Sequence, residues 1–305
     1  MSFTQTVAQI MSLFIIMVIG YIMNKRGIID DAANERYTKL VINISLPAQI
    51  IRTFISNQGI VSNGEVIAVF AYSALMYVLY AVIGVLFLFF TRVRKDQRGS
   101  YMFMMMFANV GFMGFPVIEA ILGEEAMIYA VIYNVVFNLL VYSLGILLIG
   151  KHEKGAKFPF KKMLNMPLLS AVLSIILYFA KIKLPDPLMT GLGYLGNVTT
   201  PVAMLILGSI LANMKWKELF DEWRVYVFTI GRLVVAPLAA MVLTNVLPIQ
   251  SELVKGCMIL LSAMPVATNT TMLALEYNGD VKLSSKCIFF TTVLCMITIP
   301  LITIL

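Results

Sequence analysis

The chain has 305 residues, of which 60% are hydrophobic and only 13% are charged, and its mean hydropathy is +0.90. This composition excludes a soluble globular protein and indicates an all-α integral membrane protein. The formal net charge of +7 would suit a nucleic acid, but the basic residues are distributed as in the cytoplasmic loops of membrane proteins. We therefore predict a lipid bilayer as partner and no nucleic acid.

Apolar segments recur along the whole chain. A membrane-spanning helix needs about 20 apolar residues. Ten segments meet this criterion, and their short connections leave no room for a soluble domain, so we predict a single membrane domain over residues 1–305. The predicted spans 1 to 10 cover about 4–24, 37–56, 65–91, 99–122, 125–150, 164–181, 188–212, 225–247, 252–277 and 281–305.

The basic residues predict the orientation of these spans. Eighteen of the 23 Lys and Arg residues lie in or beside odd-numbered connections, four lie in or beside even-numbered ones, and Arg232 lies within span 8. Cytoplasmic loops carry the excess of Lys and Arg. The odd-numbered connections are therefore expected in the cytoplasm, and both termini outside it, in a multi-pass protein of the cell membrane.

Ten spans divide into five and five, and an odd number in each half inverts the second half relative to the first. We predict two inverted repeats, residues 1–150 and 164–305. Prolines about 150 residues apart support the division. They are Pro47 and Pro201 in spans 2 and 7, and Pro116 and Pro265 in spans 4 and 9.

Spans 4 and 9 carry residues that interrupt helices. Gly111, Gly114 and Pro116 lie in the middle of span 4, and Pro265 lies in the middle of span 9. Paired breaks in corresponding halves indicate a transporter site, so we predict that both helices are broken and cross. Each proline is expected in the first turn of its second half-helix, whose positive end attracts anions.

Polar side chains beside the breaks are candidate ligands. Asn109 and Asn269 carry amides that donate and accept hydrogen bonds. A large amide in mid-membrane is expensive without a function, so we predict that both bind substrate. The hydroxyls of Thr268 and Thr270 either bind substrate or satisfy backbone groups released by the breaks.

Other spans contribute further candidates. Asn134 and Asn138 share one face of span 5 and either line the cavity or hydrogen-bond to neighbouring helices. Asn43 is placed to face the site from span 2. Arg232 is either an anion attractor or a structural arginine. Glu119 is interpreted as interfacial or structural, so no acidic residue is expected in mid-membrane.

The motif Asn109-x-Gly111-x-x-Gly114-x-Pro116, with Ala263-x-Pro265, Ala274-x-Glu276-Tyr277 and Leu46-Pro47, resembles the auxin efflux carrier family. The resemblance covers the whole chain. It implies ten helices in five-plus-five inverted repeats, a homodimer, a scaffold of spans 1, 2, 6 and 7, and a moving transport domain of spans 3–5 and 8–10. It also implies that a carboxylate binds at the crossover with Asn109 among its ligands.

The short connection at about 151–163 resembles bacterial members, whose relatives include malate and malonate carriers, rather than plant auxin carriers. We therefore predict a secondary transporter that moves small organic anions by elevator-like alternating access. A ligand-sensing receptor or an anion channel using the same pocket are the alternatives. A single histidine and the lack of a nucleophile–base or metal-ligand motif argue against an enzyme, a metal site or a cofactor. A coupling ion, Na⁺ or H⁺, is left open.

Overall fold

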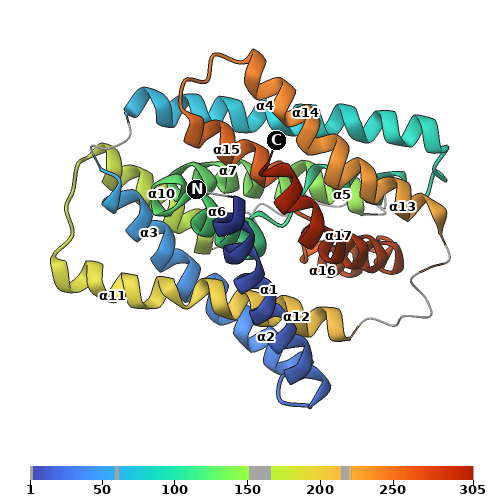
Figure 1. Ribbon diagram of the computed structural model, residues 1–305, viewed down its shortest axis with the longest axis horizontal. Coiled ribbons are helices and arrows are strands. Elements are labelled where there is room, and N and C mark those ends of the chain that lie inside the picture. Colours follow the sequence, from blue (N-terminus) through green and yellow to red (C-terminus); the bar gives the residue numbers. More distant parts are fainter. Residues whose placement is uncertain (1–2, 59–61, 151–165, 214–219, 221, 305) are drawn as a thin grey trace. The chain divides into compact units, whose positions relative to one another are not determined.

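The computed structural model describes residues 3–58, 62–150, 166–213, 220 and 222–304 (Figure 1). Helices form the regular structure of these residues, with one isolated antiparallel β-bridge between Ala108 and Val266. The connection predicted to be short and cytoplasmic, residues 151–163, lies outside the described residues.

Each segment expected from the sequence as a span coincides with one or more described helices. In the first half, span 2 is α2 continued by α3, span 4 is α5 followed by α6, and span 5 is η3 continued by α7 and α8. The bounds are α1 Phe3–Lys25, α2 Asp31–Leu40, α3 Leu46–Ser56, α4 Asn63–Thr91, α5 Arg98–Met106, α6 Phe115–Leu122, the 3₁₀ turn η3 Glu124–Ala126, α7 Met127–Leu140 and α8 Ile146–Ile149.

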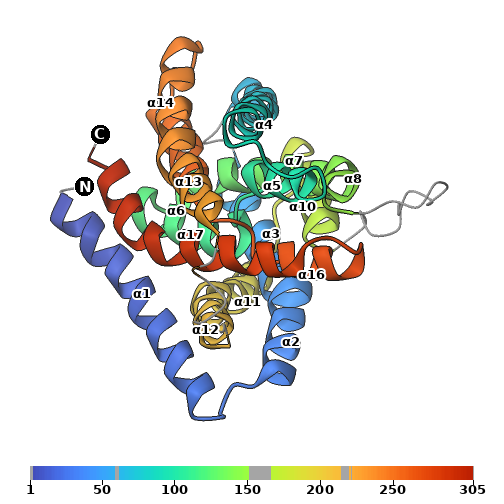
Figure 2. The ribbon, with the colours of Figure 1, turned by 90° about the vertical axis from the view of Figure 1, so that its right-hand side faces the viewer.

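The second half is divided in a similar way. Span 7 is α11 followed by α12, span 8 is α13 continued by α14 (Figure 2), and span 9 is α15 followed by α16. The bounds are α10 Met166–Phe179, α11 Asp186–Asn197, α12 Thr199–Ala212, α13 Trp223–Ile230, α14 Ala236–Val246, α15 Glu252–Ser262, α16 Thr270–Glu276 and α17 Val281–Ile302.

The length and exposure of these helices suit a lipid environment. Five continuous helical stretches of the described chain are long and apolar enough to cross a membrane. They are Gly64–Thr91, Glu124–Ile149, Asp186–Ala212, Trp223–Val246 and Val281–Ile302. Large apolar side chains on them lie at the surface, including Phe90 at 75% and Val246 at 77% exposure. Water would oppose this exposure, whereas lipid favours it.

Several prolines inside the spans follow a widened turn and do not break the helix. Five-residue π-helical turns lie at Val41–Ser45, Val110–Gly114, Val141–Gly145 and Gly231–Val235, and all but Val141–Gly145 are followed two residues later by a proline. A proline lacks the N–H that would bind the carbonyl four residues earlier and its ring clashes with that carbonyl. A π turn accommodates the mismatch within a continuous helix.

The chain folds as two compact units, each assembled from several separate segments. Unit 1 comprises residues 1–71, 111–135 and 162–213, and unit 2 comprises residues 72–110, 136–161 and 214–305. Unit 1 thus holds α1 to α3 and α10 to α12, whereas unit 2 holds most of α4 and all of α13 to α17. Span 4 begins in unit 2 and continues in unit 1.

Unit 1 is built around the pair α1 and α12, which run side by side (Figure 1). Two glycines allow the close approach: a Cβ at Gly20 would meet the backbone of Leu205, and one at Gly208 would meet the carbonyl of Met17. Small residues at such contacts let helix backbones pack closely in membranes. Near the C-terminal ends of both helices, the Ser209 hydroxyl oxygen accepts a hydrogen bond from the side-chain amide of Asn24 at 2.9 Å.

Unit 2 contains an aromatic cluster that joins three of its helices. The rings of Phe87, Tyr101 and Phe228 lie 5.1 to 5.6 Å apart, centre to centre, on α4, α5 and α13. All three side chains are buried. Rings at this separation attract each other in tilted or edge-to-face geometry, so the cluster fixes α5 against its neighbours.

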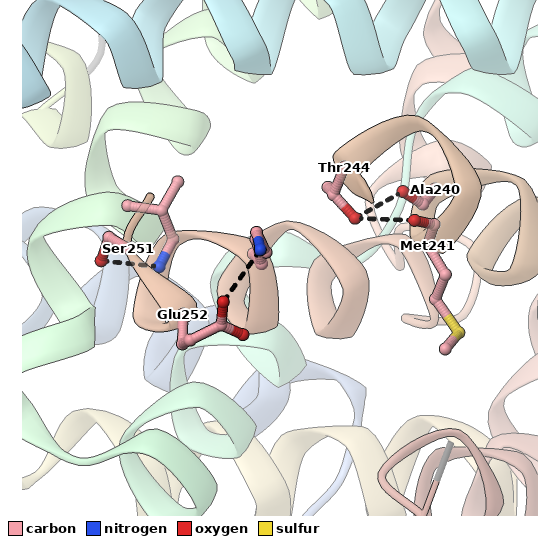
Figure 3. A network of polar contacts seen from close by, with 7 residues as sticks. Ala240, Met241, Thr244, Ser251 and Glu252 are labelled. Carbon is pink, nitrogen blue, oxygen red and sulfur yellow. Dashed lines mark hydrogen bonds and ion pairs between the residues drawn. The ribbon is translucent and has the colours of Figure 1, made fainter. Parts of the chain in front are cut away.

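The connection between α14 and α15, also in unit 2, has a polar cap (Figure 3). The Ser251 hydroxyl accepts from the N–H of Val254 at 3.4 Å, and the Glu252 carboxylate pairs with Lys255 at 2.8 Å. On α14, the Thr244 hydroxyl donates to backbone carbonyls of the preceding turn. Ser251 is the N-cap of α15 and thereby determines the residue at which this half-helix begins.

We expect Gly208→Ala to destabilise the protein, because the added methyl group overlaps the Met17 carbonyl. Overpacking of this kind costs about 1–3 kcal/mol. Gly191→Ala on α11 is the matched control, because its added Cβ meets no atom within 4 Å and alanine favours a helix. The apparent melting temperature in detergent should fall for Gly208→Ala and hold or rise for Gly191→Ala. Equal melting temperatures would contradict the packing described here.

Candidate substrate site

Both predicted interruptions are present. In span 4, α5 ends at Met106 and helical structure resumes at Val110, leaving Phe107, Ala108 and Asn109 between the two pieces. In span 9, α15 ends at Ser262 and α16 begins at Thr270. The sequence prediction that these two spans are broken near their middles is confirmed.

The two breaks meet in unit 2 as a short antiparallel bridge, formed by residues 107–109 and 265–267. The Asn109 N–H donates to the Pro265 carbonyl at 2.8 Å, and the Ala267 N–H donates to the Phe107 carbonyl at 3.2 Å. Ala108 and Val266 lie between these bonds and are buried. Backbone groups that leave a helix inside a membrane must find partners, and here each broken strand supplies them for the other.

A third element holds the bridge. The Val266 N–H donates to the Thr291 hydroxyl oxygen at 3.1 Å, and the Thr291 hydroxyl in turn donates to the Cys287 carbonyl at 2.6 Å. Thr291 is fully buried on α17. Thr291 is not among the site residues predicted from the sequence. The sequence signal is a pair of threonines, 291 and 292, within the otherwise apolar stretch 287–297.

The two asparagines beside the bridge present polar atoms with no protein partner in the described chain. They are the amide nitrogen of Asn109, a residue only 3% exposed, and the side-chain oxygen of Asn269. A buried polar atom without a partner costs about 1–3 kcal/mol. A bound polar ligand removes this cost: Asn109 can donate to a carboxylate oxygen, and Asn269 can accept from a hydroxyl or water.

Two threonine hydroxyls beside the bridge are used differently. Thr270 donates to the Ala267 carbonyl at 2.6 Å, and Thr271 donates to the Thr268 carbonyl at 3.3 Å. Both bonds serve backbone carbonyls between α15 and α16. The bond of Thr270 agrees with the interpretation that these hydroxyls satisfy backbone groups, and substrate binding by Thr268 and Thr270 stays a prediction. Thr268 is half-buried at the same turn.

Comparison with known proteins identifies the class. A family profile described as membrane transport protein matches residues 5–159 and 152–303, which together cover nearly the whole chain.

The chain belongs to the membrane transport protein (Mem_trans) family.

The auxin efflux carrier resemblance drawn from the crossover motifs is thereby confirmed, and the chain is a multi-pass membrane transporter rather than an enzyme. An uncharacterised transporter of Methanocaldococcus jannaschii is 27% identical over 308 residues, covering 96% of each chain. Another, of Methanothermobacter thermautotrophicus, is 26% identical over 99% of this chain and 98% of its own. The uncharacterised transporter YfdV of Escherichia coli is 23% identical over 97% of this chain and 96% of its own.

One of the two prolines of this family member does not lie where the sequence predicted it. Pro265 lies in the bridge, five residues before α16, so its prediction in the first turn of the second half-helix is wrong. Pro116 is in the first turn of α6, but helical structure already begins at Val110 through the π turn. The break in span 4 therefore ends seven residues before Pro116, because the π turn accommodates the proline within a continuous helix.

The remaining predicted residues are divided between the units. Asn43, Gly111, Gly114, Pro116 and Asn134 belong to unit 1, and Asn138 and Arg232 belong to unit 2 with the bridge. Asn43 is exposed and donates to the Lys39 carbonyl of its own helix at 2.8 Å. Asn134 and Asn138 are both buried.

Arg232 is the largest fully buried side chain of the described residues. Its guanidinium carbon lies 5.3 Å from the centre of the Tyr80 ring, within the range of a cation–π contact. It sits in the π turn of span 8. The side chain thus turns into unit 2 instead of extending to a membrane surface, and it places a positive charge in the same unit as the bridge.

We expect Thr291→Val to loosen the bridge, because it leaves the buried Val266 N–H without an acceptor, at a cost of about 1–3 kcal/mol. Hydrogen exchange of the peptide containing Val266 should become at least tenfold faster. Thr291→Ser should restore protection. Thr292→Val is the matched control, because the Thr292 hydroxyl is buried without a partner among the described residues. Unchanged exchange in Thr291→Val would contradict the role of Thr291.

Proposed function

We propose that the protein is a secondary transporter that moves small organic anions, namely carboxylates, by elevator-like alternating access. The observation that carries this proposal is the bridge of two broken helices, at which the amide nitrogen of Asn109 and the side-chain oxygen of Asn269 are buried without a partner in the described chain. Broken helices persist in membranes only where protein buries them or a watery cavity faces them. Paired breaks are typical of transporter substrate sites.

The charges around the bridge favour an anion over a cation. Residues 107–109 and 263–271 contain no acidic side chain, whereas Asn109 offers a free donor. Arg232 adds a buried positive charge to the same unit. A carboxylate accepts hydrogen bonds from donors of this kind, and such charge-assisted bonds are roughly twice as strong as neutral ones.

We further propose ten spans in two inverted repeats, with both termini outside the cytoplasm. Three observations support this: the family profile matches the two halves of the chain, the prolines of spans 2, 7, 4 and 9 recur about 150 residues apart, and Lys and Arg concentrate in the odd-numbered connections. The division into scaffold and transport spans and the homodimer remain part of the proposal, on the strength of the family membership.

The direction of transport has an energetic consequence. Moving one anion outward across a negative-inside membrane is favoured by about 2.3 kcal/mol per 100 mV. Uptake of the same anion is opposed by that amount unless a cation moves with it. The transporter is therefore an exporter by itself or an importer with a coupled ion.

We expect Asn109→Ala to weaken carboxylate binding at least tenfold, because a hydrogen bond to a charged group contributes about 1.5–3 kcal/mol. Asn109→Asp should weaken it further by repelling the anion. Asn245→Ala, at an exposed position on α14, is the control. Counterflow of labelled mono- and dicarboxylates into proteoliposomes measures the effect, with melting temperature as a check on folding.

The same assay distinguishes the alternatives. Saturable counterflow that is lost in Asn109→Ala supports the transporter and its site. Large unitary currents would instead indicate an anion channel, and binding without flux would indicate a receptor. Undiminished counterflow in a folded Asn109→Ala variant would overturn the assignment of the site.

A further inference from the structure

Three arginines gather in unit 2 where α4 ends and where α5 and α13 begin. Arg92 directly follows the last residue of α4. The Nε of Arg224, on α13, donates to the Thr91 carbonyl at 3.1 Å, and the Nε of Arg98, on α5, donates to the Val93 carbonyl at 3.1 Å. Thr91 and Val93 flank Arg92, so two guanidinium groups are held beside the residue that carries the third. We call these three arginines the arginine triad.

The aromatic cluster of unit 2 fixes the helix ends that carry the triad. Phe87 lies one turn before the end of α4, and Phe228 lies one turn after Arg224 on α13. Tyr101, in the first turn of α5, packs against both rings, and its hydroxyl donates to Glu222, the N-cap of α13, at 3.4 Å. The triad is therefore positioned by packed helices, and little conformational freedom is lost when a ligand binds.

The described chain offers the triad no counter-charge, because no ion pair among the described residues includes a member of it. Two acidic side chains close by are engaged elsewhere: Asp96 pairs with Arg94 at 2.8 Å, and Glu222 accepts from the tyrosine of the aromatic cluster. Arg98 and Arg224 also lie in the first turns of their helices, where the helix dipole disfavours a positive charge. Like charges held together in this way repel each other unless an anion binds between them.

The donors that remain on the triad suit a phosphate group. The backbone uses only the Nε of Arg98 and of Arg224, and these two guanidinium groups form no other hydrogen bond within the described residues. The guanidinium carbon of Arg224 lies 5.1 Å from the centre of the Trp223 ring, which further restrains that side chain. The terminal amino groups stay available, and guanidinium groups bind phosphate oxygens through paired hydrogen bonds.

Exposed aromatic side chains beside the triad indicate that the phosphate belongs to a lipid. Phe89 and Phe90, at the end of α4, and Trp223, at the start of α13, are all exposed. Exposed phenylalanines suit lipid tails, and tryptophan collects at the level of the lipid head groups. A zwitterionic head group brings a positive charge of its own, which the triad repels, whereas an anionic head group does not.

We propose that the arginine triad binds the phosphate of an anionic phospholipid at the membrane boundary of unit 2. The connections that carry the triad are odd-numbered, so the site lies on the side of the membrane that we propose to be cytoplasmic, where basic clusters attract anionic lipids. The site goes beyond the proposed anion transport and does not depend on it.

The test measures lipid binding to the purified, delipidated protein in detergent, without any carboxylate. Native mass spectrometry compares dioleoylphosphatidylglycerol, which is anionic, with dioleoylphosphatidylcholine, which is zwitterionic. We expect the protein to prefer phosphatidylglycerol, and Arg92→Gln and Arg224→Gln each to weaken its binding about fivefold. Arg94→Gln is the matched control, because it removes the same charge from the same connection but Arg94 is already paired with Asp96. It should weaken binding less than about twofold.

Three results would overturn the proposal. They are equal binding of the two lipids, equal losses in Arg94→Gln and Arg92→Gln, which would indicate diffuse attraction, and stabilisation by inorganic phosphate as large as that by phosphatidylglycerol, which would indicate a site for a soluble anion. If Arg224→Gln does not fold, Arg92→Gln still decides, because the Arg92 side chain forms no hydrogen bond or ion pair within the described residues. Phosphatidylglycerol binding that is kept in Asn109→Ala separates this site from the proposed anion site, so that either can fail without the other.

Discussion

The structure depends on one requirement, that backbone groups released from a helix inside a membrane must be paired again. The bridge between residues 107–109 and 265–267 meets it with two hydrogen bonds between the broken spans and a third from Val266 to Thr291. Each break supplies the partners of the other, so neither is stable alone. This mutual dependence places two chain segments more than 150 residues apart beside each other.

Proline alone does not determine where a span breaks. Pro47, Pro116 and Pro237 each follow a π turn, in which the helix widens and continues. Pro265 instead lies in an extended segment, and its carbonyl accepts from Asn109. The difference lies in what surrounds the proline. At Pro265 a neighbouring segment exchanges two backbone hydrogen bonds with the break, whereas at the other three prolines a π turn keeps the hydrogen bonds within the helix.

The sequence predicted the breaks because Gly, Pro and Asn are local signals, and it predicted the helical spans because hydropathy is a property of each segment. It misplaced Pro265 relative to its half-helix, because the register after a break depends on the partner strand. It missed Thr291 and the contacts of Glu119 with Gln49 and Thr200 for a related reason. Both side chains are defined by partners on other spans, and no spacing within their own span reveals those partners.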